Sequence, residues 1–174
     1  KAFGKAIGIK ADVFSLWINK GLALQELNEH QEALDAFSKA TTLSGNVHEA
    51  WNYKGYVFEE IGKHQEALDA YDKAIQIKPD FVIAFNNKGL LQDTMGNHLE
   101  AIETYNKALT IKPDLDIAWF NKACAEALLS NKEGALSSLK KAIELNQSFK
   151  RIARTNPDFS KIKDDPDFIN VVGN

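Results

Sequence analysis

The chain has 174 residues, of which 44% are hydrophobic and 26% charged, and its formal net charge is −3. This composition is typical of a folded protein, and the small negative charge argues against nucleic acid as a partner, because phosphate binding needs a concentrated basic face. No apolar stretch approaches the roughly 20 residues of a membrane-spanning helix. The single cysteine, Cys124, excludes an internal disulfide and suits a reducing compartment, so we expect a cytoplasmic protein.

A period of 34 residues runs through most of the chain. Residues 48–81 and 82–115 align without a gap and share about fifteen identities. Self-similarity at a period of this size indicates stacked structural repeats rather than one irregular fold. The complete units are 14–47, 48–81, 82–115 and 116–149.

Residues 1–13 precede the first complete unit and keep its register. Phe3 and Ala6 fall where Phe37 and Ala40 fall one period later. We therefore interpret residues 1–13 as the remnant of the second helix of a preceding repeat, in a fragment of a longer array. A tag or a generic leader is the alternative, although neither has a reason to keep register. Because the chain begins with Lys rather than Met, we expect the natural start to lie upstream.

Each unit has an anchor pattern that is typical of two short packed helices. An aromatic residue is followed four residues later by a small one, and an alanine is followed four residues later by a bulky residue and then by another alanine. The spacings of three and four place these residues on one face of a helix. The first helices are expected at about 14–27, 48–61, 82–95 and 116–129, and the second helices at about 31–43, 65–77, 99–111 and 133–145.

The connections have residues that end helices. Gly62 and Gly96 stand where a first helix is expected to end with positive φ, and Asn28 and Ser130 take their place in the other two units. Two units close with a proline, which resists helix continuation. The four closing positions hold Gly45, Pro79, Pro113 and Gln147.

Residues 150–174 leave the period and contain two similar helix starts. Asn156 and Asp165 each precede a proline, a combination typical of a capped helix with proline at its first position. We expect short helices at about 148–155, 157–162 and 166–172 that form a C-terminal cap. A repeat array needs such a cap because its last unit otherwise exposes an apolar face to water.

The anchors together resemble the tetratricopeptide repeat, over roughly residues 14–149. One departure recurs: the position before the small residue, usually leucine in that family, holds lysine in all four units, in the style of prokaryotic and archaeal repeats. The resemblance implies an all-α fold, a right-handed α-α superhelix (solenoid) of stacked helix-turn-helix units. It also implies that the first helices line a concave groove in which a partner binds.

The resemblance places the partner-binding groove on defined positions of the first helices. Asparagines there suit the backbone of an extended peptide, or else they bond structurally to a neighbouring helix. Tyr53 and Tyr56 suit anchor pockets, or else they are partly buried between hairpins. Ser15, Ile18, Gln25, Glu49, Glu59, Asp93 and Cys124 are also expected to face the groove. The strongest candidates are Asn19, Leu22, Glu26, Asn52, Tyr53, Tyr56, Glu60, Ile83, Asn86, Asn87, Leu90, Ile117, Phe120 and Asn121.

The charge of this groove predicts the chemistry of the partner. Chaperone-binding members of the family hold an acidic C-terminus with a clamp of lysine, arginine and asparagine, and here only Asn87 stands in the slot of a clamp arginine. The groove has acidic residues instead, which favour a neutral-to-basic or partly apolar segment. We expect a protein or peptide partner, no nucleic acid and no membrane.

The sequence indicates no catalytic chemistry. Three histidines, His30, His64 and His98, recur one period apart. Stacked helices lie about 8–10 Å apart, whereas metal–nitrogen bonds are near 2 Å, so these histidines are not expected to share a metal ion. We expect no metal, no cofactor and no enzyme activity. The leading hypothesis is a protein-interaction scaffold. The alternatives are an interaction arm of a larger multidomain protein, such as an enzyme, and a homo-oligomer that stacks end to end through its exposed repeat ends.

Overall fold

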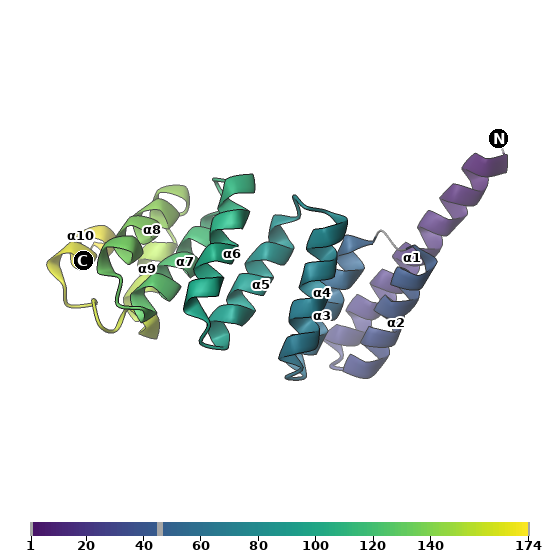
Figure 1. Cartoon of the computed structure of the whole chain (residues 1–174), viewed down its shortest axis with the longest axis horizontal. Coiled ribbons are helices and arrows are strands. Elements are labelled where there is room, and N and C mark those ends of the chain that lie inside the picture. The colour runs from purple at the N-terminus through teal and green to yellow at the C-terminus, as the bar shows by residue number, and fades with distance from the viewer. Residues whose placement is uncertain (1, 45–46, 174) are drawn as a thin grey trace. The chain divides into compact units, whose positions relative to one another are not determined.

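The computed structural model describes the backbone of residues 2–44 and 47–173, and the side chains of residues 13–44 and 47–173. The described residues form helices and no strand, and the chain divides into two compact units, one ending at Ala84 and the other beginning at Phe85 (Figure 1). The helices are α1 (Ala2–Glu26), α2 (His30–Leu43), α3 (His48–Glu60), α4 (His64–Ile77), α5 (Val82–Thr94), α6 (His98–Ile111), α7 (Asp116–Leu128), α8 (Lys132–Leu145), α9 (Phe149–Thr155), the 3₁₀ helix η1 (Pro157–Phe159) and α10 (Pro166–Val172).

Close packing of a ring against a glycine joins the two helices of a hairpin. Phe37 of α2 and Tyr71 of α4 are fully buried. A Cβ atom added at Gly21 of α1 would lie 2.5 Å from the ring of Phe37, and one at Gly55 of α3 would lie 2.6 Å from that of Tyr71. Only a residue without a side chain allows this approach, so the recurring small residue brings the hairpin together.

The turns between the paired helices confirm the prediction from the sequence. Gly62 and Gly96 have φ of +75° and +83°, and Asn28 and Ser130 have φ of 60° and 61°. These values lie in the left-handed region that glycine and asparagine enter most easily. Each second helix begins within one residue of its expected position. The closing residue Gly45 lies outside the described residues.

The structure differs from the sequence analysis at the N-terminus. Residues 2–26 form one continuous helix, with no break between a remnant helix and the first helix of the first unit. The reason lies at the junction: Lys10-Ala11-Asp12 stands where the later units have Lys78-Pro79-Asp80 and Lys112-Pro113-Asp114. Alanine is the best helix former, whereas proline resists continuation, so the helix passes through.

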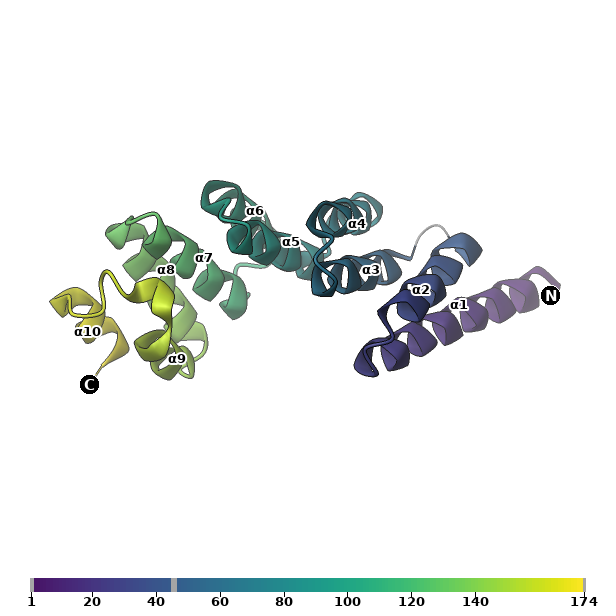
Figure 2. The ribbon, with the colours of Figure 1, turned by 90° about the horizontal axis from the view of Figure 1, so that it is seen from below.

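The C-terminal cap forms in the second unit. The Asn156 side chain accepts a hydrogen bond from the Asp158 amide at 2.8 Å, and the Asp165 side chain accepts one from the Asp167 amide at 2.9 Å, as expected for the two proline-initiated helices. Figure 2 shows α9 and α10 gathered beside α8. Phe159 is fully buried and lies 5.4 Å from Phe168, ring centre to ring centre, in the core cluster of α7 and α8.

Candidate functional site

Six of the residues expected to face a groove line one cavity in the first unit. The cavity has a volume of about 370 Å³ and lies between the first helices of two successive repeats. We call it the groove cavity. Its lining from α1 is Phe14, Ser15, Ile18, Asn19 and Leu22, and its lining from α3 and the preceding loop is Ser44, Val47, His48, Glu49 and Tyr53.

The periodicity of the two helices explains this convergence. Ser15, Ile18, Asn19 and Leu22 follow one another at spacings that keep them on one side of α1. Ile18 and Leu22 are half-buried against the core of the first unit, while Asn19 is exposed. The cavity therefore combines an apolar floor with a polar edge.

Tyr53 is both packed and accessible, so the two expectations for it are compatible. Its ring stacks on Phe37, with the ring centres 5.4 Å apart and the planes at 23°, and the residue is half-buried. Tyr56, one turn further along α3, is 42% exposed. The packed ring gives Tyr53 a fixed orientation at the cavity, and Tyr56 presents its side chain to solvent.

One wall of the groove cavity contains an imidazole beside a carboxylate. His48 Nε2 lies 3.1 Å from Glu49 Oε1, and the His48 ring meets Phe81 edge-on with centres 4.6 Å apart. Burial lowers the pKa of His48, although the Glu49 carboxylate opposes this shift. The imidazole is therefore mostly neutral at pH 7, and Glu49 contributes a negative charge to the cavity.

Further along the same helices, two other predicted groove acids are exposed. Glu26 of α1 and Glu60 of α3 lie at the surface, and Glu60 Oε2 is 3.7 Å from Nδ1 of His30. Glu59, by contrast, accepts a hydrogen bond from the buried Tyr71. The acidic character expected of this surface therefore comes from Glu26, Glu49 and Glu60, while Glu59 is part of the hairpin.

The predicted asparagines have different surroundings. Asn19 lines the groove cavity, whereas Asn52 is only 6% exposed. In the second unit, Asn121 Nδ2 donates to Asn86 Oδ1 at 3.2 Å, and Asn87 is half-buried. The bond between Asn86 and Asn121 joins α5 to α7, which is the structural role that the sequence left open.

The other predicted groove residues fall into an exposed and a buried group. Ile83, Leu90 and Ile117 are 53%, 43% and 39% exposed. Phe120 and Cys124 are each 5% exposed, and the Phe120 ring stacks on Phe149 with centres 4.5 Å apart. The expectation of an open position is therefore wrong for Phe120 and Cys124, because the C-terminal cap packs against this face of α7.

Four lining residues of the groove cavity were missed from the sequence: Phe14, Ser44, Val47 and His48. A signal for two of them was present, because Phe14 and His48 occupy the same position one period apart, each directly before a predicted groove residue. Ser44 and Val47 belong to the connection between α2 and α3, whose path the repeat pattern does not determine.

The described side chains provide little for bond-making chemistry. Burial raises the pKa of the Cys124 thiol, although the hydrogen bond that Asn156 Nδ2 donates to its sulfur at 3.5 Å opposes this shift. The thiolate that a nucleophile requires is therefore disfavoured. In the described part of the chain, no three His, Cys, Asp or Glu side chains are grouped to hold a metal ion. No helix in that part is long and apolar enough to cross a membrane.

Comparisons with known proteins agree on the fold. A crystal structure of MamA superposes with a TM-score of 0.72 at 25% identity, over 86% of this chain and 88% of that chain. The pilF protein of Pseudomonas aeruginosa superposes with a TM-score of 0.77 at 17% identity, over 88% of this chain and 68% of that chain. The first tetratricopeptide-repeat domain of Spaghetti (RPAP3), bound to the HSP90 peptide SRMEEVD, superposes with a TM-score of 0.63 at 15% identity, over 67% and 93%.

No curated protein sequence matches the chain. Models of the tetratricopeptide repeat, however, match residues 48–81 and 82–115, and a second model of the same repeat matches residues 14–47 and 117–149. These matches cover well over half of the chain. The chain therefore belongs to the tetratricopeptide repeat family, an all-α solenoid of stacked helical hairpins whose members generally act as non-catalytic interaction modules.

Proposed function

We propose that the protein is a non-catalytic scaffold that holds a segment of a partner protein in its concave groove, with the groove cavity of the first unit as the main contact. The observation that supports the proposal most is the convergence of six predicted groove residues, from two helices, on one cavity of about 370 Å³. Concave, partly apolar sites with a few polar groups are typical of ligand-binding surfaces.

The lining favours one kind of segment. Ile18 and Leu22 offer an apolar floor, Asn19 offers an amide that both donates and accepts, and Glu49 adds a negative charge. An extended segment with an aliphatic side chain and a nearby basic residue satisfies all of these groups. The same charge disfavours a segment that ends in acidic residues.

The acidic peptide SRMEEVD held by the Spaghetti (RPAP3) domain is therefore a poor guide to the ligand here. In the present chain, the positions that correspond to the lysine and arginine clamp hold Ile18, Leu22, Tyr53, Ile83 and Asn87. None of these side chains has a positive charge, so the groove lacks the group that would neutralise a C-terminal carboxylate.

A peptide array followed by titration tests the proposal. The full chain is applied to an array of random hexapeptides, and the bound sequences are synthesised and titrated against the chain and two variants. Asn19→Ala/Glu49→Gln alters the groove cavity, while Asn106→Ala/Glu103→Gln makes the same changes on the exposed surface of α6. We expect the groove variant to weaken binding by about tenfold or more and the α6 variant to have no effect.

The composition of the bound peptides is the second readout. We expect aliphatic and basic residues to be enriched and acidic residues to be depleted, with affinity that falls as salt is raised. The proposal is wrong if the groove variant retains every peptide at the affinity of the unchanged chain, or if acidic C-terminal peptides dominate the array.

A further inference from the structure

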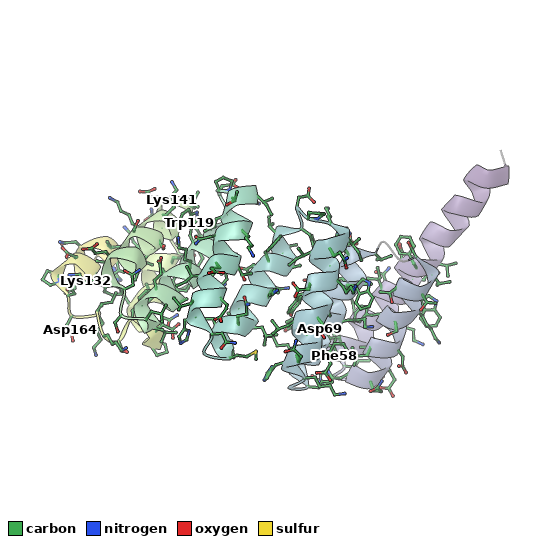
Figure 3. All side chains as sticks on the ribbon, in the orientation of Figure 1. Phe58, Asp69, Trp119, Lys132, Lys141 and Asp164 are labelled. Carbon is green, nitrogen blue, oxygen red and sulfur yellow. The ribbon has the colours of Figure 1, made fainter. Side chains whose placement is uncertain are left out.

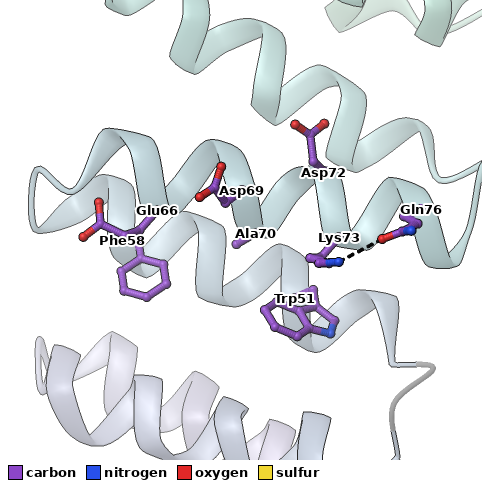
Figure 4. A pocket seen from close by; sticks show the side chains of 8 residues that line it. All are labelled: Trp51, Phe58, Glu66, Asp69, Ala70, Asp72, Lys73 and Gln76. Carbon is purple, nitrogen blue, oxygen red and sulfur yellow. Dashed lines mark hydrogen bonds between the residues drawn. The ribbon is translucent and has the colours of Figure 1, made fainter.

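A second and larger cavity lies on the hairpin of α3 and α4. Its volume is about 630 Å³, and it shares no lining residue with the groove cavity (Figure 4). We call it the α3–α4 pocket. Figure 3 shows Phe58 and Asp69 on this hairpin among the described side chains. The pocket is lined by Trp51 and Phe58 from α3, and by Glu66, Asp69, Ala70, Asp72, Lys73 and Gln76 from α4.

The sequence explains why the floor of this pocket is apolar. In the third and fourth repeats, a polar pair joins the two helices at one position: Thr104 Oγ1 donates to Gln92 Oε1 at 2.7 Å, and Ser138 Oγ donates to Glu126 Oε2 at 2.6 Å. One or two periods earlier, the same two positions hold Phe58 and Ala70. The second repeat thus has an aromatic ring and a methyl group in place of a hydrogen-bonded bridge.

The equivalent position in the first repeat shows what can lie over the indole. There, the ammonium groups of Lys39 and Lys20 lie 4.3 Å and 5.3 Å from the ring centre of Trp17, in cation–π contact. That surface, lined by the matching residues of α1 and α2, has a smaller cavity of about 370 Å³. The chain's own lysines thus cover the first-repeat indole.

In the second repeat, only one of the two matching lysines lies over the indole. Lys73 matches Lys39, but its Nζ donates to Gln76 Oε1 at 3.0 Å. Among the described side chains of the first unit, only the ammonium of Lys54 lies over the Trp51 ring, at 4.5 Å. The two repeats differ at the residue three positions after this lysine: Thr42 donates its hydroxyl to the Ser38 carbonyl, whereas Gln76 accepts from Lys73. Gln76 therefore draws Lys73 away from the indole.

The charges around the pocket complement an incoming cation. Glu66, Asp69 and Asp72 are three carboxylates among its lining residues. They outnumber the two nearby ammonium groups, that of the lining residue Lys73 and that of Lys54 over the Trp51 ring. Glu66 and Asp69 are exposed on the same face of α4. A planar guanidinium can stack on an indole and at the same time donate to a carboxylate, which a lysine ammonium does less well.

We propose that the α3–α4 pocket is a second binding site, which takes an arginine flanked by aliphatic residues from a partner protein. The guanidinium stacks on Trp51 in the position that Lys39 occupies over Trp17, and it donates to the carboxylates of Asp69 and Glu66. The flanking aliphatic side chains lie on Phe58 and Ala70. The site is separate from the groove, so one partner segment can occupy each.

The test uses the ¹⁵N-labelled full chain and a blocked peptide of sequence Gly-Leu-Arg-Leu-Gly. The chain has three tryptophans, whose indole N–H signals are assigned from single Trp→Phe variants. We expect the peptide to shift the Trp51 signal saturably and to leave those of Trp17 and Trp119 in place. The analogue with citrulline, which has the same shape without the charge, is expected to bind about tenfold more weakly.

Matched variants distinguish binding in this pocket from non-specific attraction of the peptide to acidic residues elsewhere on the chain. Glu66→Gln/Asp69→Asn is expected to weaken binding about fivefold or more, while Glu32→Gln/Asp35→Asn, the same change at the equivalent positions of the first repeat, has no effect. Gln76→Thr copies the first repeat and releases Lys73 onto Trp51, so it is expected to weaken binding as well. Asn19→Ala/Glu49→Gln, in the groove cavity, is expected to leave it unchanged.

Three results would overturn the proposal: no saturable shift of the Trp51 signal, equal binding of the arginine and citrulline peptides, or equal loss of binding in the first-repeat control. None of these results bears on the groove proposal, whose test uses other peptides and other variants.

Discussion

The hydroxyl of Tyr71 donates a hydrogen bond to Oε2 of Glu59 at 2.9 Å, across the hairpin of α3 and α4. One repeat later, the hydroxyl of Tyr105 is buried without a partner among the described residues. The residue that matches Glu59 is Asp93, which is one methylene shorter and is paired with His98 instead, at 2.6 Å. The same buried tyrosine is thus bonded in one repeat and unbonded in the next.

This contrast predicts opposite effects of one substitution. Tyr71→Phe leaves the half-buried carboxylate of Glu59 without its donor and should reduce the free energy of unfolding by about 1–3 kcal/mol. Tyr105→Phe removes a hydroxyl that has no partner and should be neutral or stabilising, because the cost of burying that group disappears. Urea unfolding of both variants measures the difference, and equal destabilisation by the two would contradict it.

The contact between Gly21 and Phe37 gives a second prediction. Gly21→Ala places a methyl group where it would lie 2.5 Å from the ring, so the ring must move, at a cost of about 1–3 kcal/mol. The fourth repeat shows how this cost is avoided, because Ala123 is matched there by Leu139 rather than by an aromatic residue. We expect Phe37→Leu to destabilise the native chain but to be less harmful when Gly21→Ala is present.

A double-mutant cycle on the free energy of unfolding measures that coupling, which we expect to be favourable by about 1 kcal/mol or more. Additive effects of the two substitutions would show that the methyl group is accommodated elsewhere, and that the glycine and the ring are not a matched pair.

Much of the fold could be predicted because its determinants are local. The positive φ at Asn28 and Ser130 follows from the position of these residues within the repeat. The helix starts at Pro157 and Pro166 follow from the capping side chain just before each proline. The repeat pattern gave a wrong prediction for residues 2–26, where it places a helix end near residue 11. Ala11 stands there in the position of Pro79 and Pro113, and the helix continues.

The site was harder to predict because it depends on contacts between repeats and on side-chain orientation. Phe120 occupies a groove position in the pattern, yet residues 149–172 fold back and bury it, and no period describes those residues. The repeat pattern likewise does not predict the α3–α4 pocket. Access to the Trp51 ring in this pocket depends on the orientation of the Lys73 side chain, which bonds to Gln76. The family resemblance predicted which positions face a groove, and the packing of individual side chains decided which of these residues are accessible.

The cap supplies a third prediction. Phe159 is fully buried and approaches Phe120 edge-on, with ring centres 6.0 Å apart. Phe159→Ala removes a large side chain from the cluster that closes the fourth repeat and should cost about 3–5 kcal/mol. Hydrogen exchange should show the loss of protection concentrated in α7, α8 and α9, and uniform loss across α1 to α4 as well would contradict a role confined to the second unit.

Glu126 supplies a pH-dependent prediction. It is 6% exposed, and burial raises its pKa above the usual value, although the hydrogen bond from Ser138 and the nearby Lys122 oppose the shift. The folded state therefore binds a proton at Glu126 more readily than the unfolded state does. At pH 7, the ionised carboxylate is destabilising relative to a neutral group, and this cost disappears as the pH falls below the unfolded pKa of about 4.5.

Glu126→Gln removes the charge and copies the third repeat, where Gln92 accepts the equivalent hydrogen bond from Thr104. We expect the variant to be more stable than the native chain at pH 7 and the difference to vanish by about pH 4. Urea midpoints of both proteins at half-unit pH intervals measure it. A variant that is less stable at pH 7, with a deficit that shrinks on acidification, would show that the ion pair with Lys122 outweighs the burial of the carboxylate.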